Sequence, residues 1–464
     1  MAPFRLIHKA WQAVFACLLF APLSAETFEL SLDDGRIAAR QAALAGQFEM
    51  ARDFALALTQ ADVNDRAALI VLAAVQPRLG AAGDGRRAGA RAYRLSETQD
   101  ERYEAARLTA LAAANERRFT LSQLWLRRAA VSAPDDMAFQ QTQSDYRGIR
   151  ILNPWSMNLG FSMTSSSNVN GGSNSEFSVI DGVTFPDGTP VIGFFSGSAR
   201  ALPGTSATLD IRATYALSRS EQKQTSITAR TYARSVWLND EAREIAPDSR
   251  NSDFGSQLFE VSIDHARLLS DAVLSAQTKI TTSWFSGDLS AGAVRGRLGY
   301  GIATGQQTRL TFTGQIEQTY DPDPWTRDNT GGLIAAAVNH IDARGGRLTG
   351  SLTFSAQSSE NLNERYETLA AQVGYAWADP VAPVQLSIAG GIAWSDFRDY
   401  TIIFKVPGGR QDTRIFGSLT AVFPDVDYAG FVPVMTLGFQ DTQSNVSRFE
   451  RDEYSLNIGV RSSF

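Results

Sequence analysis

The sequence predicts two parts: an all-α N-terminal part made of tetratricopeptide-like helical repeats, and a C-terminal transmembrane antiparallel β-barrel of about 14 strands. The apolar period changes from helical spacing to strict alternation at Asn153-Pro154-Trp155. The final segment, residues 454–464, alternates apolar and polar residues almost without a break. A strand with one apolar and one polar face separates two unlike media. Taken alone, this segment also fits the edge strand of a soluble protein.

Residues 1–25 have the features of a secretory signal peptide. Arg5 and Lys9 precede an apolar run, and Leu23-Ser24-Ala25 provides the small residues of a cleavage site. The run is too short to span a bilayer, so we expect it to be removed. The single cysteine, Cys17, lies inside the run and suggests a lipoprotein signal as an alternative, but the apolar run continues past it. The mature chain then has no thiol or disulfide chemistry.

Residues 26–150 are rich in Ala, Leu and Arg, and their apolar residues recur at helical spacing. Gly46-Gln47-Phe48 and Arg118-Phe119 mark two helix junctions that are separated by about two repeats of roughly 34 residues. We therefore expect about three tetratricopeptide-type helix pairs in the periplasm. Such repeats present a concave surface suited to extended peptides. An unrelated Ala-rich helical bundle is the alternative.

Residues 151–464 read as an outer-membrane barrel of fourteen alternating strands. Short connections alternate with longer polar ones, as in bacterial barrels, and an even strand count puts both ends on the periplasmic side. A β-sandwich is disfavoured because strands this long and regular are unusual there. The strands are expected near residues 156–164, 204–217, 223–236, 253–266, 271–285, 287–300, 306–320, 331–342, 345–357, 363–377, 382–396, 411–423, 430–442 and 453–464.

The last strand resembles the C-terminal assembly signal of outer-membrane barrels. It has a polar residue at Asn457, a glycine at Gly459 and an aromatic residue at Phe464. Ser462 departs from that signal, which prefers an apolar or aromatic residue there. This resemblance implies the barrel-assembly machinery and outer-membrane lipid as partners. We expect this strand to close the barrel against residues 156–164.

The chain offers little material for catalysis or metal binding. Beyond the signal, its histidines are His265 and His340, and neither has a His or Cys partner at metal-ligand spacing. An outer-membrane hydrolase that uses His340 beside Asn339 is a weaker alternative. The acidic loop at 320–328 lacks the regular spacing of a calcium loop and fits a solvated turn better. We expect no enzyme activity, cofactor or metal.

Charge is distributed unevenly along the chain. The signal carries +2, residues 26–150 balance to zero, and residues 151–464 carry −8 of the total of −6. This acidic excess argues against nucleic acid as a partner. Charged side chains on the inward faces indicate a water-filled path, while cross-strand pairs that only satisfy the interior are the alternative. The candidate path residues are Arg212, Arg230, Arg234, Lys279, Arg295, Arg297, Arg309 and Glu317, with Asp210 on the same face.

The segment from Asn153-Pro154-Trp155 to Ser167-Asn168-Val169-Asn170 resembles the surface lipoprotein assembly modifier (Slam) family. In that family a helical domain leads into the first strand, and a Ser-Asn-x-Asn segment follows it. The resemblance covers essentially the whole mature chain. It implies an outer-membrane translocator of the type XI secretion route, which moves a surface lipoprotein or secreted protein client from the periplasm to the cell surface. The residues alone support only a barrel joined to peptide-binding helices.

An exopolysaccharide export porin is the second hypothesis. Such porins also join tetratricopeptide helices to a barrel, but they usually carry more repeats and an acidic, aromatic-lined interior. The helical part here is short and the mapped interior contains arginine, which favours the protein translocator.

Overall fold

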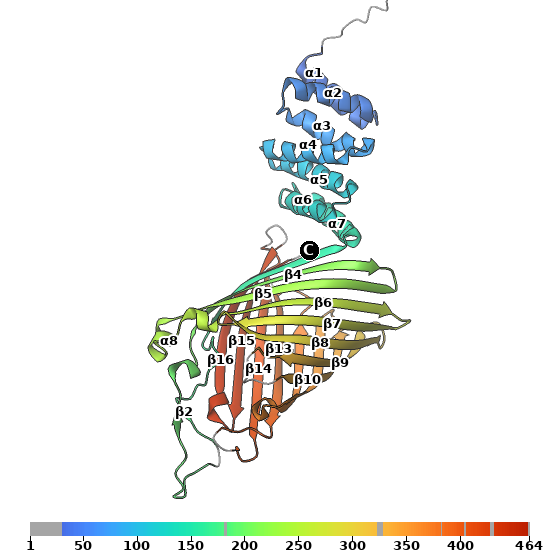
Figure 1. The fold of residues 1–464 in the computed structure, drawn as a ribbon. Coiled ribbons are helices and arrows are strands. Elements are labelled where there is room, and N and C mark those ends of the chain that lie inside the picture. Colours follow the sequence, from blue (N-terminus) through green and yellow to red (C-terminus); the bar gives the residue numbers. More distant parts are fainter. Residues whose placement is uncertain are drawn as a thin grey trace, which may run out of the picture. The chain divides into compact units, whose positions relative to one another are not determined.

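The computed structural model describes residues 30–180, 183–322, 328–381, 383–402, 405–426 and 431–462. The predicted signal peptide, most of the acidic loop at 320–328 and Phe464 lie outside the described residues. The chain forms two compact units, which divide after Arg117. Helix gives way to strand between Leu152 and Trp155, at the predicted change of apolar period. The predicted fold class, a helical repeat followed by an antiparallel barrel, is confirmed (Figure 1).

The first unit consists of antiparallel helices joined by short turns. First helices of successive pairs begin at Leu32, Arg66 and Gln99, about 34 residues apart, which is the tetratricopeptide spacing. Each of them has a side-chain N-cap, from Ser31, Asp65 and Thr98 respectively, whereas α2 and α4 have none. The helices are α1 (Leu32–Leu44), α2 (Phe48–Ala61), α3 (Arg66–Val75), the 3-10 helix η1 (Gln76–Leu79), α4 (Ala82–Leu95) and α5 (Gln99–Asn115).

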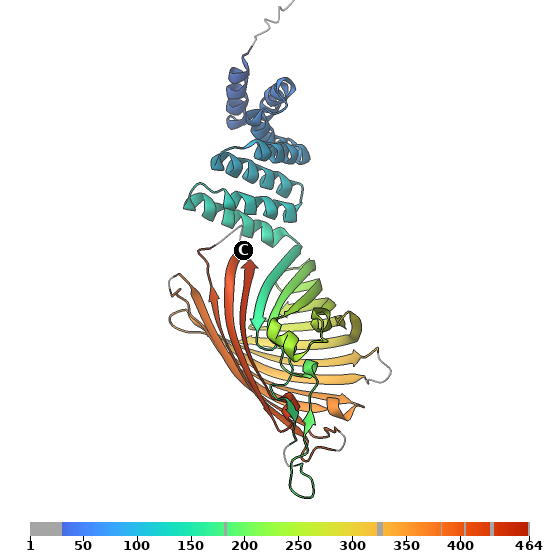
Figure 2. The same cartoon turned by 90° about the vertical axis from the view of Figure 1, so that its left-hand side faces the viewer.

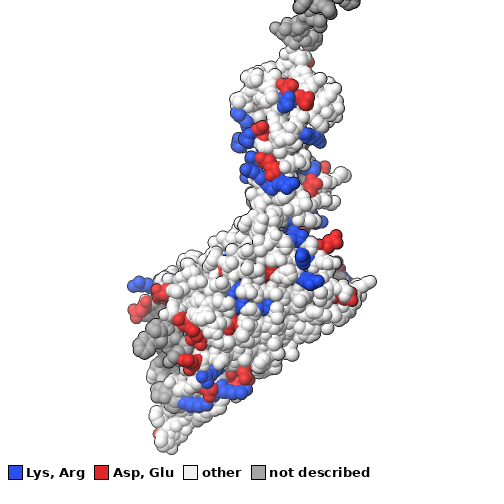
Figure 3. All heavy atoms as spheres, turned by 45° about the vertical axis from the view of Figure 1, so that its right-hand side comes forward, with Lys and Arg blue, Asp and Glu red and all other residues white. Residues whose placement is uncertain are grey.

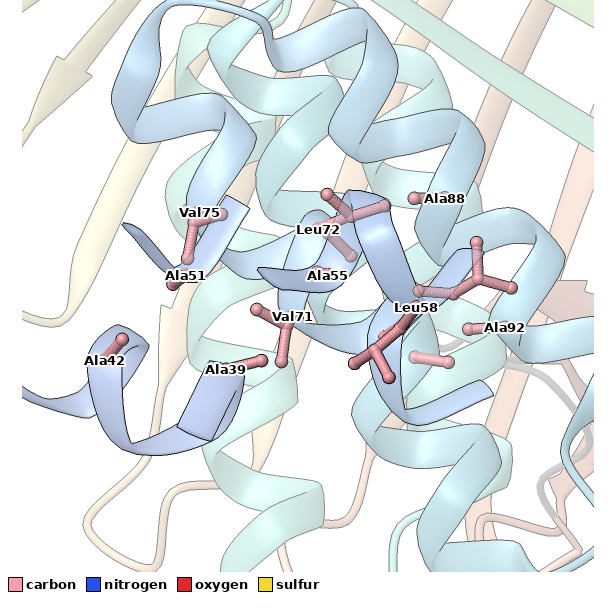
Figure 4. Packing of buried hydrophobic residues seen from close by; sticks show 14 residues of the cluster. Ala39, Ala42, Ala51, Ala55, Leu58, Val71, Leu72, Val75, Ala88 and Ala92 are labelled. Carbon is pink, nitrogen blue, oxygen red and sulfur yellow. The ribbon is translucent and has the colours of Figure 1, made fainter. Parts of the chain in front are cut away.

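Small residues make the core of this unit. Ala39, Ala51, Ala55 and Ala68 are fully buried, and Figure 4 shows several of these alanines among a few larger side chains such as Leu72. Short side chains allow helix axes to approach closely, and the close packing then supplies the dispersion energy.

The closest approach joins α4 to α5. A Cβ added to Gly89 would lie 2.4 Å from the Thr109 hydroxyl oxygen, so only glycine fits at this position.

The second unit begins with the helix pair α6 (Phe119–Val131) and α7 (Asp136–Leu152) and continues into a closed barrel. Asp135 caps α7 by accepting from the Ala138 amide. The predicted junctions at Phe48 and Phe119 are confirmed, because α2 and α6 begin there. No helix in the described part of the chain combines the length and the apolar character that a membrane crossing needs.

Fourteen strands close the barrel, and every one of the predicted strands is present. Each pairs antiparallel with its neighbours, and β1 pairs with both β4 and β16 (Figure 2). A separate two-stranded sheet of β2 (Phe177–Ser178) and β3 (Gly193–Phe194) lies in the long β1–β4 connection, and α8 (Asp240–Ile245) follows β5. The barrel strands are β1 (Trp155–Ser166), β4 (Gly204–Arg219), β5 (Lys223–Leu238), β6 (Ser256–Leu268), β7 (Ala272–Phe285), β8 (Asp288–Ala303), β9 (Thr308–Tyr320), β10 (Asn329–Ile341), β11 (Arg347–Ser359), β12 (Tyr366–Ala376), β13 (Gln385–Phe397), β14 (Arg410–Val422), β15 (Phe431–Ser444) and β16 (Arg451–Ser462).

Alternation gives the wall two unlike faces. Outward positions carry exposed apolar side chains such as Leu298, Phe312 and Ile334, while the residues between them point into the barrel. Figure 3 shows a broad stretch of wall without charged side chains. An apolar outer band around a polar interior is the arrangement of an outer-membrane barrel.

The barrel closes along a short seam. β1 pairs with β4 from Trp155 to Ser166, but with β16 only from Phe161 to Ser166. The closing strand therefore meets residues 161–166, so that the predicted contact with 156–164 is displaced toward the far end of β1. Among the described residues, Arg461 and Ser462 continue β16 without a partner on β1.

Candidate functional site: the barrel interior and its loop end

An ion-pair network crosses four neighbouring strands inside the barrel. Arg230 on β5 donates to both carboxylate oxygens of Asp210 on β4, at 2.9 and 2.7 Å. On its other side Arg230 donates to Glu260 on β6 at 3.1 Å, and Lys279 on β7 reaches the second oxygen of Glu260 at 3.0 Å. Glu260 is thus shared by two cations, as a carboxylate with little exposure requires.

A second pair continues on the next strands. Arg295 on β8 is bonded to Glu317 on β9, directly across the ladder. Lys279 and Arg295 face each other in the β7–β8 register, so that the two groups of charges adjoin. The geometry therefore shows cross-strand pairing, the alternative to a water-filled path, for four of the candidate path residues. They are Arg230, Lys279, Arg295 and Glu317.

Three of the candidate path residues differ from these. Arg212, Arg297 and Arg309 point into the barrel, are exposed, and have no hydrogen bond or ion pair with any described residue. Exposure inside a closed barrel means that these side chains are reached by water. They are the free charges of the interior.

Arg234 has a different place from the one predicted. It lies at the loop end of β5, where its guanidinium donates to the carbonyl oxygens of Val169 at 2.8 Å and Phe254 at 3.3 Å. It therefore holds two loops together and is not brought into the ion-pair network. Its side chain lies near an apolar cluster of the loops that includes Leu202 and Val236.

The junction residues connect the helices to the barrel. Asn153 is 5 % exposed; its Nδ2 donates to Gln123 Oε1 of α6 at 2.6 Å, and its Oδ1 accepts from the Trp155 amide at 3.0 Å. The carbonyl of Pro154 accepts from the Ala216 amide at 2.8 Å. This short segment therefore ties α6 and the start of β1 to β4.

The Asn168 and Asn170 side chains build the first long loop. Asn168 Nδ2 donates to the Gly172 carbonyl, and its Oδ1 accepts from the Gly172 amide, both at 2.9 Å. Asn170 donates to the Arg200 carbonyl at 2.8 Å and accepts from the Leu202 amide at 2.9 Å. An asparagine satisfies a donor and an acceptor at once, which explains this residue type at both positions.

The same loop is bonded to the last loop of the barrel. The Ser167 hydroxyl oxygen accepts from the Tyr454 amide at 3.0 Å, and Ser173 Oγ donates to the Ser447 carbonyl at 2.7 Å. Ser447 Oγ donates in turn to the Phe177 carbonyl at 2.8 Å. The first and last loops thus lie across the β1–β16 seam at this end.

Two of the assembly-signal residues lie on the seam itself. Asn457 Nδ2 donates to Ser162 Oγ at 3.0 Å and Thr164 Oγ1 at 2.6 Å across the seam. A Cβ added to Gly459 would lie 2.9 Å from the Phe161 carbonyl oxygen. Both residues have a direct role in closure that their resemblance to a sorting signal does not predict.

Two residues of the interior are absent from the candidates predicted above. One is Glu260. Alternation along β6 places it inside, because its outward neighbours are Phe259, Val261 and Ile263. The other is Arg410, whose guanidinium carbon lies 3.6 Å and 3.5 Å from the ring centroids of Phe397 and Phe449. The Arg410 contacts join the β13–β14 hairpin to the loop before β16, and no local pattern signals them.

The histidines lie outside the interior path. His265 Nδ1 and His340 Nδ1 are hydrogen-bonded to threonine hydroxyls, Thr225 at 2.9 Å and Thr308 at 2.8 Å. Both are at outward positions of their strands. Within the described ranges no group of three or more His, Cys, Asp or Glu side chains is placed to hold a metal ion.

Hollows adjoin both faces of the wall, and two of them illustrate this. One of about 1310 Å³ is lined mainly by outward-facing side chains of β12 to β16, including Ile388 and Leu437, and so faces lipid. One of about 340 Å³ lies beside Arg414, Gln440 and Glu453, whose positions on their strands are inward. The second hollow belongs to the interior.

Comparisons with known proteins give similarity of shape only. No protein-family model matches the chain, and no curated protein matches it. A loop-deletion variant of OmpT from Vibrio cholerae aligns over 67 % of this chain and 99 % of its own, with a TM-score of 0.35 and 10 % identity. A bacterial polysaccharide outer membrane secretin aligns over 66 % and 98 %, with 0.33 and 8 %.

The helical part has a likeness of its own. The type III secretion translocator chaperone SycD of Yersinia enterocolitica aligns over 26 % of this chain and 88 % of its own, with a TM-score of 0.24 and 15 % identity. Likenesses this distant carry no argument about function. The 14-stranded barrel and the helix pairs rest on the geometry of this chain.

Proposed function

We propose that this protein is an outer-membrane translocator that moves a protein client, a surface lipoprotein or a secreted protein, from the periplasm to the cell surface. The observation that carries the proposal is the junction at Asn153, where a helical repeat is bonded directly into the first barrel strand. This is the segment that resembles the Slam family. A repeat of this kind suits an extended peptide, and the barrel suits its passage.

The strand count supports a periplasmic position for the helices. Both Trp155 and Ser462 are at the barrel end that carries the short turns, which in bacterial barrels faces the periplasm. The helices would then meet the client before it enters the barrel. No covalent chemistry is part of the proposal.

Deletion of the gene tests the proposal. In the deletion strain, a candidate client encoded next to it should disappear from the cell surface while its total amount in the cell is retained. Surface levels are measured on intact cells with an antibody to the client, and an unrelated surface protein serves as the control. A client that stays at its wild-type surface level in the deletion strain contradicts the proposal. Where deletion does remove the client from the surface, re-expression of the full chain should restore it.

Export of an exopolysaccharide is the second candidate. The interior arginines would suit an anionic polymer, although the expectation for such a porin is a longer helical repeat. Loss of polymer secretion in the deletion strain, with the protein client still on the surface, would support this candidate over the first.

A further inference from the structure

Free positive charge inside the barrel is concentrated on arginines. Five inward arginines have no hydrogen bond, ion pair or ring contact with any described residue. Alternation places each of them inside, because their strand neighbours include exposed apolar residues such as Leu298, Leu348 and Val460. These five, named the free arginines below, are Arg212, Arg297, Arg309, Arg347 and Arg461.

The inward carboxylates on the described parts of the barrel strands, in contrast, accept hydrogen bonds. Asp210, Glu260, Glu317 and Asp412 are each paired with an arginine or lysine. The two others accept from neutral groups: Asp264 from Ser262 at 2.8 Å, and Glu453 from Ser166 at 2.8 Å. Arg212 also attracts the Asp210 carboxylate on its own strand, whereas the other four free arginines are uncompensated cations. The interior therefore offers positive charge, although the barrel segment as a whole carries −8.

The free arginines are arranged along the path. Arg309 and Arg347 stand at the start of β9 and β11, and Arg461 lies near the end of β16, so that all three are at the short-turn end. Arg212 and Arg297 lie further along their strands. A chain that enters at the short-turn end would meet positive charge first at the opening and then inside.

Three strands next to or near β9 and β11 form a neutral part of the wall. Inward positions of β10, β12 and β13 are mostly small and uncharged within their described strands, so they offer few groups that would hold a passing chain. Examples are Ala335, Ala337, Thr368, Ala370, Ser387, Ala389 and Ala393.

From this charge distribution we infer that the interior binds an acidic polypeptide segment of the client. The inference rests on the proposed function and names the chemistry of the segment that the barrel takes. Carboxylates of the segment form charge-assisted hydrogen bonds with the free arginines. The neutral wall lets the segment slide, and the positive opening raises its local concentration.

Polymer binding to the purified full chain in nonionic detergent tests this inference. Fluorescein-labelled poly-L-glutamate is titrated and its anisotropy recorded at low and high salt, with poly-L-lysine of the same length as the opposite-charge probe. We expect poly-L-glutamate to bind, to weaken with salt, and to bind about tenfold or more weakly to the Arg212→Gln, Arg297→Gln, Arg309→Gln triple variant. Poly-L-lysine should not bind.

A charge-matched control separates interior binding from general attraction. Arg40, Arg94 and Arg147 are exposed helix residues without a described partner, and their triple Gln variant should bind poly-L-glutamate like the wild type. The inference is overturned if both triple variants lose poly-L-glutamate binding to the same extent, or if the interior variant binds it like the wild type. It is also overturned if poly-L-lysine binds as well as poly-L-glutamate. Tight binding of alginate without binding of poly-L-glutamate also overturns it, in favour of an anionic polysaccharide.

The inference and the proposed function fail in different ways. A client that remains on the surface after gene deletion removes the proposed function whatever poly-L-glutamate does. If gene deletion removes the client from the surface, but the interior triple variant binds poly-L-glutamate as the wild type does, the proposed function stands. Only the inference that the interior binds an acidic segment is then disproved.

Discussion

Asn153 Nδ2 donates to Gln123 Oε1 at 2.6 Å, and this bond fixes the last helix pair to the strand that begins the barrel. The Asn153 side chain also accepts from the Trp155 amide, so one buried residue serves both elements. The segment that suggested the family resemblance is thus a mechanical joint between helix and strand.

Replacing Asn153 with Ala should loosen this joint. The variant loses the hydrogen bonds of the buried Asn153 side chain with Gln123, Thr120 and the Trp155 amide, which costs about 1–3 kcal/mol locally. We expect limited trypsin digestion to cut faster after the exposed Arg150, while the barrel itself stays folded. Gln141→Ala on the exposed face of α7 is the control. Equal cutting of the Asn153 variant and the wild type would mean that the joint depends on other contacts.

Gly459→Ala should hinder barrel closure. The new Cβ would lie 2.9 Å from both the Phe161 carbonyl oxygen and Ser162 Cβ, so β1 must move. We expect the free energy of unfolding to fall by about 1–3 kcal/mol. On a gel, a smaller fraction of the variant should run as the folded, heat-modifiable form. Gly314→Ala is the matched control, because no atom lies within 4 Å of its added Cβ. The prediction fails if the two variants fold to the same extent.

Glu260→Gln should destabilise the barrel more than the same change at an exposed ion pair. Glu260 serves both Arg230 and Lys279 in the interior, and neutralising it leaves two cations without their shared partner. The free energy of unfolding should fall by about 2 kcal/mol, measured by urea unfolding with tryptophan fluorescence as the signal. Glu367→Gln, which breaks the exposed pair with Arg398, should cost less than about 1 kcal/mol. A reversed order would show that the interior network adds little.

Acid should weaken the start of α5. Hydrogen bonds from the backbone amides of Glu97 and Thr98 hold the pKa of the Glu101 carboxyl below its usual range. A lowered folded-state pKa gives stability that is complete above the unfolded pKa of about 4.3 and is lost as the pH falls through the folded value. Hydrogen exchange at the α5 amides, corrected for intrinsic rates, should therefore speed up below about pH 4.

The matched variants give this pH test its control. Glu101→Gln should exchange faster near neutral pH and lose the acid dependence, whereas Glu97→Gln, four residues earlier, should behave like the wild type. An acid response that persists in Glu101→Gln would place its origin in another group.

The alternation of the barrel strands made the fold predictable. A period of two needs no knowledge of distant residues, and neither does the helical period before Asn153. The alternation also places the path residues on one face. It does not show which of them are paired, because the register of three strands decides that Arg230 meets Asp210 and Glu260.

The loop end could not be predicted for a different reason. Its bonds join residues such as Ser173 and Ser447, which are 274 positions apart. Irregular backbone carries no period, so the partners of its polar groups are decided by the tertiary fold alone. Arg234 was misplaced for this reason, since its strand position is that of a path residue while its partners are loop carbonyls.

The place of β1 in the barrel has a consequence for how the chain assembles. From β4 to β16 every strand pairs with its neighbour in sequence, so these ladders can form as successive hairpins with little loss of chain entropy. β1 likewise pairs with the next barrel strand, β4, across the long loop between them. Its pairs with β16 join residues up to 299 positions apart, as between Phe161 and Val460, and contacts of such sequence separation are slow to form. We therefore expect the strands to be laid down as a growing ribbon, and the seam between β1 and β16 to form last.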